Sequence, residues 1–180
     1  MGRKYKRIIK PLIKFIDKQK IFFVATGTDG GKINLSPKGL DSFKVLSPNK
    51  IIWLNLTGSG NETADHLLLN DRITIMICSF EGNPMILRIY GSAKAYHEND
   101  NLFKIYEGYF PDYPAKRQII EVNISMVQTS CGFGVPLMEF KKERTELIDW
   151  SNEKGVDGIK SYWEEKNKKS IDGFDTQIIK

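Results

Sequence analysis

Cysteine and histidine are scarce in this chain, with two of each among 180 residues. Cys78 and Cys131 lie far apart and form no CxxC pair, and His66 and His97 have no companion at metal-ligand spacing. A disulfide framework, a zinc site and a two-histidine iron site are therefore not expected, and we predict no bound metal. Cys78 lies in the apolar run ITIMICSF, where we expect it to be a small buried hydrophobic residue.

Familiar catalytic motifs are also missing. The sequence Gly58-Ser59-Gly60 does not match the Gly-x-Ser-x-Gly nucleophile elbow. The surrounding turn lacks the lysine of a Walker A loop, and its glycines do not match the dinucleotide-binding fingerprint. No convincing set of acid, base and nucleophile is recognisable, so no catalytic residue is assigned, and any redox chemistry should reside in a cofactor.

No apolar run approaches the ~20 residues that a membrane-spanning helix requires. The basic N-terminus has neither the continuous apolar core nor the cleavage site of a signal peptide, so we expect a cytoplasmic protein without a membrane partner. Residues 1–20 hold eight basic side chains and one acidic one, whereas the remainder of the chain carries a net charge of −2. A solvated basic face explains this asymmetry better than nucleic-acid binding, because no DNA- or RNA-reading motif accompanies it.

Short apolar runs separated by turn residues dominate the chain and predict a mainly β fold. We expect strands in IFFVAT and KINLS and at 43–46, 51–56, 73–80, 86–97 and 119–127. Three or four helices are too few for a doubly wound sheet, so the pattern favours an antiparallel barrel over a sandwich. We expect one domain, with an N-terminal helix and barrel over residues 1–140 and a helical extension over residues 141–180 that packs on the barrel or on a partner subunit.

The stretch IIWLNLTGSGNETADHLLLN (residues 51–70) combines a strand, a glycine turn and the start of a helix. Asn61 or Thr63 is expected to cap that helix. The first turn of a helix leaves backbone N–H groups without internal partners at the positive end of the dipole, which favours a phosphate. An ordinary glycine-rich connector remains an equal interpretation of the local pattern.

Three further segments carry candidate ligand-binding residues. Ser36 and Lys38 would share one face of an extended strand, where a hydroxyl and a cation can hold a phosphate, although a solvated Ser-Pro turn is the plainer interpretation. Arg88 interrupts an apolar strand and either lines a pocket or points outward. The Cys131–Gly134 loop suits close packing on a planar ligand or another subunit, or a tight structural turn.

Several segments together resemble one known family: FFVAT, NLSPKG, WLNLTGSGNETADHL, ITIMICSFEGNPMILRIYG, SCGFGVP and KNKKSIDG. They resemble the pyridoxamine 5′-phosphate oxidase-like proteins, in particular FMN-binding split-barrel members, from about Phe22 to Gly173. The resemblance implies a split antiparallel β-barrel and a homodimer with FMN at the subunit interface. It also implies a flavin-dependent oxidoreductase acting on a small substrate that the sequence does not identify.

The resemblance further implies which residues contact the cofactor. Ser36 and Lys38 would lie near the FMN phosphate. Backbone or side-chain contacts to the flavin would come from Asn55, Thr57, Gly58, Ser59, Gly60, Asn61 and Thr63. Arg88 and the loop residues Cys131, Gly132 and Phe133 would complete the site, with the second subunit as one source of them.

Two other functions stay open at this point. A module of the same fold could hold a flavin or haem without turnover, or the chain could act through its basic N-terminus with the glycine turn as a connector. The chain also departs from pyridoxamine phosphate oxidases themselves, because it lacks their arginine-rich substrate-phosphate segment near the C-terminus. Vitamin B6 is therefore not predicted as its substrate.

Overall fold

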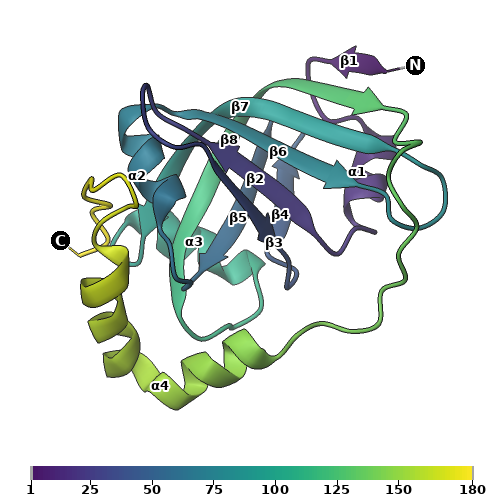
Figure 1. Cartoon of the computed structure of the whole chain (residues 1–180). Helices are drawn as coiled ribbons and strands as arrows, with labels where there is room; N and C mark the ends of the chain where they lie inside the picture. Colours follow the sequence, from purple (N-terminus) through teal and green to yellow (C-terminus); the bar gives the residue numbers. More distant parts are fainter. Residues whose placement is uncertain (1, 180) are drawn as a thin grey trace.

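Eight antiparallel strands form a single sheet in the computed structural model, which describes residues 2–179 (Figure 1). Runs rich in isoleucine, valine and aromatic residues form its long strands, because these side chains pack well on a pleated surface. The strands are β1 (Arg3–Tyr5), β2 (Phe22–Thr26), β3 (Asn34–Lys38), β4 (Phe43–Ser47), β5 (Lys50–Leu56), β6 (Arg72–Cys78), β7 (Ile86–His97) and β8 (Lys116–Ser130).

The sheet curls into a split barrel. Its strand order is β3-β2-β6-β7-β8-β5-β4, with β1 added to β8 outside this path. Four strands separate β2 from β4 in that order, yet the rings of Phe22 and Phe43 approach to 4.9 Å between centroids. This contact across the interior brings the two halves of the sheet together, while β3 and β4 end the path. The predicted mainly β, split-barrel fold is confirmed.

Alternating apolar side chains fill the interior of the barrel. Val24, Ile75 and Ile89 lie opposite one another on three neighbouring strands and are fully buried. The helical elements are α1 (Lys10–Ile16), α2 (Glu62–Leu69), α3 (Asn101–Tyr106), α4 (Glu146–Tyr162), the 3₁₀ turn η1 (Glu107–Tyr109) and the π-helical turn η2 (Trp163–Asn167). Helix α1 has Pro11 in its first turn, where proline is well tolerated, and packs against this interior core.

Strand β5 and the first half of β8 are buried on both faces. Their interior face joins the barrel core, whereas Leu54 and Ile119 pack with Phe103 of α3 on the other face. The five consecutive residues 51–55 are all buried. The end of β5 is therefore a rigid support for the turn that follows it.

The C-terminal part of the chain packs against the outside of the barrel end. Residues 131–145 contain no helix or strand, and Figure 1 shows them running from the end of β8 along the side of the barrel to α4. Helix α4 is kinked at Gly155, whose φ of +65° lies outside the helical region. Beyond the kink, Ile159 and Trp163 form a small buried cluster with Ile178.

The structure adjusts two expectations about local elements. Strand β8 begins at Lys116 rather than at Ile119, so it includes polar residues that the apolar pattern left out. Asn61 occupies the N-cap position of α2, but the expected side-chain cap by Asn61 or Thr63 is wrong, because α2 has no side-chain cap hydrogen bond. No helix within residues 2–179 is long and apolar enough to cross a membrane.

Candidate functional site

A pocket of about 280 Å³ lies where β3, the end of β5, the glycine turn and the start of β8 meet. We call it the glycine-turn pocket. Its lining residues are Asn34, Ser36, Lys38, Asn55, Leu56, Gly58, Ser59, Gly60, Asn61, Glu62, Thr63 and Arg117. Segments predicted separately from the sequence, NLSPKG and the glycine turn, thus line one pocket.

Strand alternation places Ser36 and Lys38 on the same side of β3. Ser36 pairs with the fully buried Val24 of β2, so its side chain faces the barrel interior. The Oγ atom of Ser36 is buried and has no hydrogen-bond partner within residues 2–179. A buried hydroxyl without a partner is costly, and a bound polar ligand would satisfy it.

Lys38 is a partly desolvated cation at the pocket. Its Nζ atom lies 5.4 Å from the ring centroid of Trp53. Burial, with the nearby charge of Arg117, lowers the pKa of the Lys38 ammonium from 10.5 to about 8. In the part of the chain that the structure describes, no carboxylate pairs with it.

Arg117 is the second cation at the pocket, and a β-bulge in β8 determines its position. Asn55 pairs with Gln118 and Leu56 pairs with Lys116, so Arg117 is the extra residue of β8. It is 3% exposed, and burial lowers its pKa to about 10. Its Nη1 donates to the Gly60 carbonyl at 2.8 Å, whereas its buried Nε has no partner within residues 2–179. Hydrogen bonds from Nη1 therefore fix the guanidinium, whereas its Nε–H has no acceptor within residues 2–179.

The carbonyl groups of the glycine turn accept hydrogen bonds that hold the turn in place. The carbonyl oxygens of Gly58 and Gly60 accept hydrogen bonds from Arg117 and from Asn167 of η2. The amides of Gly58, Ser59 and Gly60 have no acceptor within residues 2–179. With the start of α2 beside them, these donors suit an anion.

A chain of buried amide side chains forms the wall behind the pocket. Asn55 Nδ2 donates to Gln118 at 2.9 Å, and Gln118 Nε2 donates to Asn61 Oδ1 at 3.0 Å. Asn61 Nδ2 in turn donates to the Asn167 carbonyl at 3.3 Å. This network explains why Asn61 does not cap α2, since both ends of its side chain are already engaged.

The remaining polar groups of the pocket are mostly engaged. Asn34 donates to the Thr63 hydroxyl at 3.2 Å. Thr57, a predicted site residue, is not among the lining residues, and its hydroxyl donates to the Ala115 carbonyl at 3.0 Å. Glu62 is the one carboxylate among the lining residues, and its Oε2 accepts from the Ile171 amide at 2.9 Å. Two cations therefore face one carboxylate, which leaves the pocket net positive when Lys38 is protonated.

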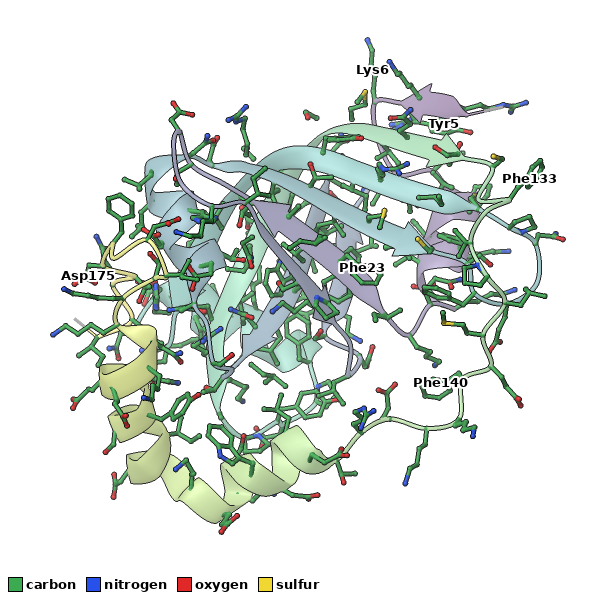
Figure 2. All side chains as sticks on the ribbon, viewed as in Figure 1. Tyr5, Lys6, Phe23, Phe133, Phe140 and Asp175 are labelled. Atoms are coloured by element: carbon green, nitrogen blue, oxygen red, sulfur yellow. The ribbon has the colours of Figure 1, made fainter. Side chains whose placement is uncertain are left out.

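The structure does not bring every predicted site residue to this pocket within one chain. Arg88 lies across from Met76, which pairs with Phe23, so it shares the sheet face opposite to that of Ser36. Its Nη1 donates to Ser130 at 3.3 Å. The loop with Cys131, Gly132 and Phe133 follows, and Figure 2 shows Phe133 projecting outward on the side opposite Asp175.

Three larger hollows, of about 550, 660 and 560 Å³, lie elsewhere on the surface. In the first, Lys116 and Lys160 pair with Glu107 and Glu98. The second is lined by Lys94 and by two carboxylates. In the third, Lys44 pairs with Asp41. The glycine-turn pocket is the better anion site despite its smaller size, because its two cations are desolvated and have no ion-pair partner within residues 2–179.

Sequence reasoning missed three residues of the site: Arg117, Gln118 and Asn167. Arg117 and Gln118 precede the apolar run of β8, where polar residues commonly mark only the edge of a strand. Asn167 lies more than 100 residues beyond the turn that it contacts. The one available signal was the adjacent basic pair Lys116-Arg117 directly before a buried strand.

The family model of pyridoxamine 5′-phosphate oxidase matches residues 10–131. The chain belongs to this family. The matched range contains strands β2 to β8 and all the lining residues of the glycine-turn pocket, whereas β1, α4, η2 and the segment after them lie outside it. The family and the split barrel that the sequence resemblance implied are thus confirmed.

Known proteins similar to this family member include a fungal relative and two bacterial structures. The pyridoxamine 5′-phosphate oxidase family protein ustO of Aspergillus flavus is 43% identical over 130 residues, which cover 68% of this chain and 51% of ustO. The chain thus spans about half the length of that relative.

The HupZ protein of group A Streptococcus has a TM-score of 0.51 at 20% identity, covering 66% of this chain and 91% of that one. A protein of Lactobacillus delbrueckii named as a candidate pyridoxamine 5′-phosphate oxidase has a TM-score of 0.54 at 17% identity, covering 68% and 94%. These two likenesses support the fold.

Proposed function

We propose that this family member binds FMN with the phosphate end in the glycine-turn pocket and acts as a flavin-dependent oxidoreductase on a small substrate. One observation carries the proposal: two desolvated cations, Lys38 and Arg117, meet the unpartnered hydroxyl of Ser36 in one pocket. Burying unpaired positive charge is costly unless an anion offsets it. A phosphate dianion offers both the charge and the acceptor atoms that these groups lack.

The lining residues match a phosphate group in hydrogen-bonding chemistry as well as in charge. Arg117 offers its Nε, Lys38 its ammonium and Ser36 its hydroxyl, and the turn adds the amides of Gly58 to Gly60. All of these are hydrogen-bond donors, which an ionised phosphate requires, because it only accepts. When bound, the flavin would supply hydride or electron transfer, and the protein would bind and orient it.

The size of the pocket supports a site completed by a second copy of the chain. About 280 Å³ lies at the lower limit of pockets that enclose a whole ligand, roughly 300–1,000 Å³, so it suits the phosphate end better than a complete flavin. Ile33 and Leu35, beside the pocket, expose 81% and 64% of their surface at the edge of the sheet. An exposed apolar edge favours association, and we propose a homodimer with the cofactor at the interface.

A visible absorbance spectrum of the purified protein, before and after added FMN, tests this function. We expect the bands of an oxidised flavin, which bleach on reduction and recover in air. A protein that retains flavin but reduces no acceptor would be a binding module rather than an oxidoreductase. A Soret band, or no affinity for FMN, would contradict the proposal.

A further inference from the structure

The C-terminal extension forms hydrogen bonds with the glycine turn and the residues beside it. In sequence, the extension lies beyond the residues that match the family model. Trp163 Nε1 donates to the Thr57 hydroxyl at 2.8 Å, and the Ile171 amide donates to Glu62 at 2.9 Å. These contacts join η2 and the segment after it to both ends of the turn. The extension is therefore attached directly to the wall of the glycine-turn pocket.

Asn167, the last residue of η2, is the centre of this attachment. Its side chain is fully buried, its Oδ1 accepts from Arg117 Nη1 at 2.9 Å, and its Nδ2 donates to the Gly58 carbonyl at 2.9 Å. The opposite amide orientation would point N–H groups at the guanidinium and oxygen at the carbonyl. The Asn167 carbonyl also accepts from the Thr176 hydroxyl at 2.6 Å, which fixes the residue from behind.

We propose that Asn167 is a positioning residue that holds Arg117 in place for an anion while leaving its charge uncancelled. A carboxylate at this position would make a stronger bond to the guanidinium, but it would also neutralise the cation that the ligand needs. The amide is neutral, and so are the carbonyls of Gly58 and Gly60 that share Arg117 Nη1. The guanidinium is thus oriented entirely by uncharged acceptors, and its Nε remains without a partner in residues 2–179.

This inference rests on the proposed phosphate site, and it makes the C-terminal extension part of that site. Positioning acts on the phosphate end of the ligand alone. Its loss should therefore affect FMN, which carries the phosphate, more than riboflavin, which lacks it. A merely structural role of Asn167 would weaken both ligands together.

The test compares the affinity of the wild-type chain, Asn167→Ala and Asn167→Asp for FMN, riboflavin and inorganic phosphate. We expect each variant to lose about tenfold or more of its affinity for FMN and for phosphate, with riboflavin affinity changed by less than about twofold. Asn167→Asp should be at least as poor as Asn167→Ala, although it keeps an acceptor for Arg117. Asn152→Asp on the exposed surface of α4 makes the same chemical change away from the pocket and should bind like wild type.

Thermal unfolding of each variant separates folding from binding, and Asn167→Ala keeps the test informative if the buried aspartate prevents folding. Unchanged FMN and phosphate affinities in folded Asn167 variants would overturn the inference while leaving the proposed function intact. Parallel losses for FMN and riboflavin would also overturn it. A wild-type chain that binds neither FMN nor phosphate would remove the proposed function as well.

Discussion

Lys38 and Arg117 are cations kept from solvent without an ion-pair partner in residues 2–179, and their ionisation should govern ligand affinity. In the free protein the pKa of Lys38 is lowered to about 8, mainly by burial. A bound phosphate dianion favours the charged ammonium and would raise that pKa again. Binding should therefore take up a proton wherever free Lys38 is neutral.

We predict that FMN affinity is greatest between about pH 6, where a phosphate monoester becomes a dianion, and pH 8, where Lys38 begins to lose its proton. Flavin fluorescence titrations from pH 6 to 9.5 measure this. Lys38→Met should bind more weakly and lose the decline above pH 8. An affinity that stays constant to pH 9.5 in the wild type would contradict a role for Lys38.

The same pKa makes a separate prediction for stability without ligand. Because the folded pKa is lowered, the unfolded chain binds more protons between about pH 8 and the usual lysine pKa of 10.5. The contribution of Lys38 to the free energy of unfolding is therefore unfavourable below pH 8 and improves as pH rises through that window. Comparison of wild type with Lys38→Met by chemical denaturation at several pH values isolates this contribution.

Ser36→Ala combined with Lys38→Ala should release the flavin. Loss of the charge-assisted contact is expected to cost ~1.5–3 kcal/mol of binding free energy, roughly ten- to a hundredfold in affinity. Equilibrium titration with FMN measures it. Lys18→Ala changes an exposed lysine outside the pocket and should have no effect. Intact flavin binding in the double variant would favour the glycine turn as a mere connector.

Among single residues, position was predictable where it follows from the local sequence. Ser36 and Lys38 alternate on a strand, so their shared face follows from spacing alone, and the structure puts both at the pocket. Arg117 could not be found in that way, because its orientation depends on a bulge that the sequence of β8 does not mark. Its binding partner Asn167 comes from a distant segment.

At the level of elements, the pairing of β7 with β8 contains a register shift whose steric requirement can be tested. The register shifts between Tyr90 and Gly91, where a Cβ on Gly91 would collide with the carbonyl oxygen of Asn123. We predict that Gly91→Ala lowers the free energy of unfolding by about 1–3 kcal/mol, as overpacking does in well-packed regions.

Urea denaturation of Gly91→Ala measures this loss, and Gly108→Ala is its control. A Cβ on Gly108 would meet no atom within 4 Å, and this glycine has no positive φ. The control should therefore unfold like wild type. Equal stability of both variants would contradict the predicted cost of the collision between a Cβ at position 91 and the Asn123 carbonyl oxygen.

Element boundaries were predictable only as far as apolar residues mark them. Strand β7 was predicted at its observed bounds, because its apolar and aromatic residues extend to both ends. Strand β8 was predicted too short, because its first three residues are polar and are buried or half-buried by partners from β5, β7 and η2. The absent cap of α2 has the same cause, since tertiary hydrogen bonds compete for Asn61.

For the whole molecule, the positions of Arg88 and Phe133 decide how a complete site could be assembled. Both lie away from the glycine-turn pocket of their own chain. If they belong to the cofactor site, the partner subunit must supply them. The predicted homodimer and their predicted contacts are therefore a single hypothesis.

Mixed dimers can test this hypothesis directly. We predict that Lys38→Ala and Arg88→Ala homodimers each bind FMN weakly, whereas a heterodimer of the two variants regains one intact site. Tandem-tag purification after co-expression, followed by flavin titration, should give about half of the wild-type stoichiometry at wild-type affinity. Heterodimers without a tight site would show that Lys38 and Arg88 do not act across the interface.

The broad architecture was predictable because it depends on the count and spacing of strands, which are features of the whole sequence. The helical extension was predicted to pack on the barrel or on a partner, and within residues 2–179 it packs at the end of the barrel. Its contribution to the pocket was not predictable, because amide-to-carbonyl contacts leave no mark in composition or periodicity.

The long sequence separation between the glycine turn and the residues that brace it has a consequence for biosynthesis. Trp163 and Asn167 lie 106 and 109 positions after Thr57 and Gly58, and Thr176 follows them. Domains begin to fold while the ribosome is still translating. A nascent chain could therefore complete its sheet before Arg117 has its hydrogen bond to Asn167. Cofactor capture would then wait until these last segments emerge, so a truncated product could be well folded and yet colourless.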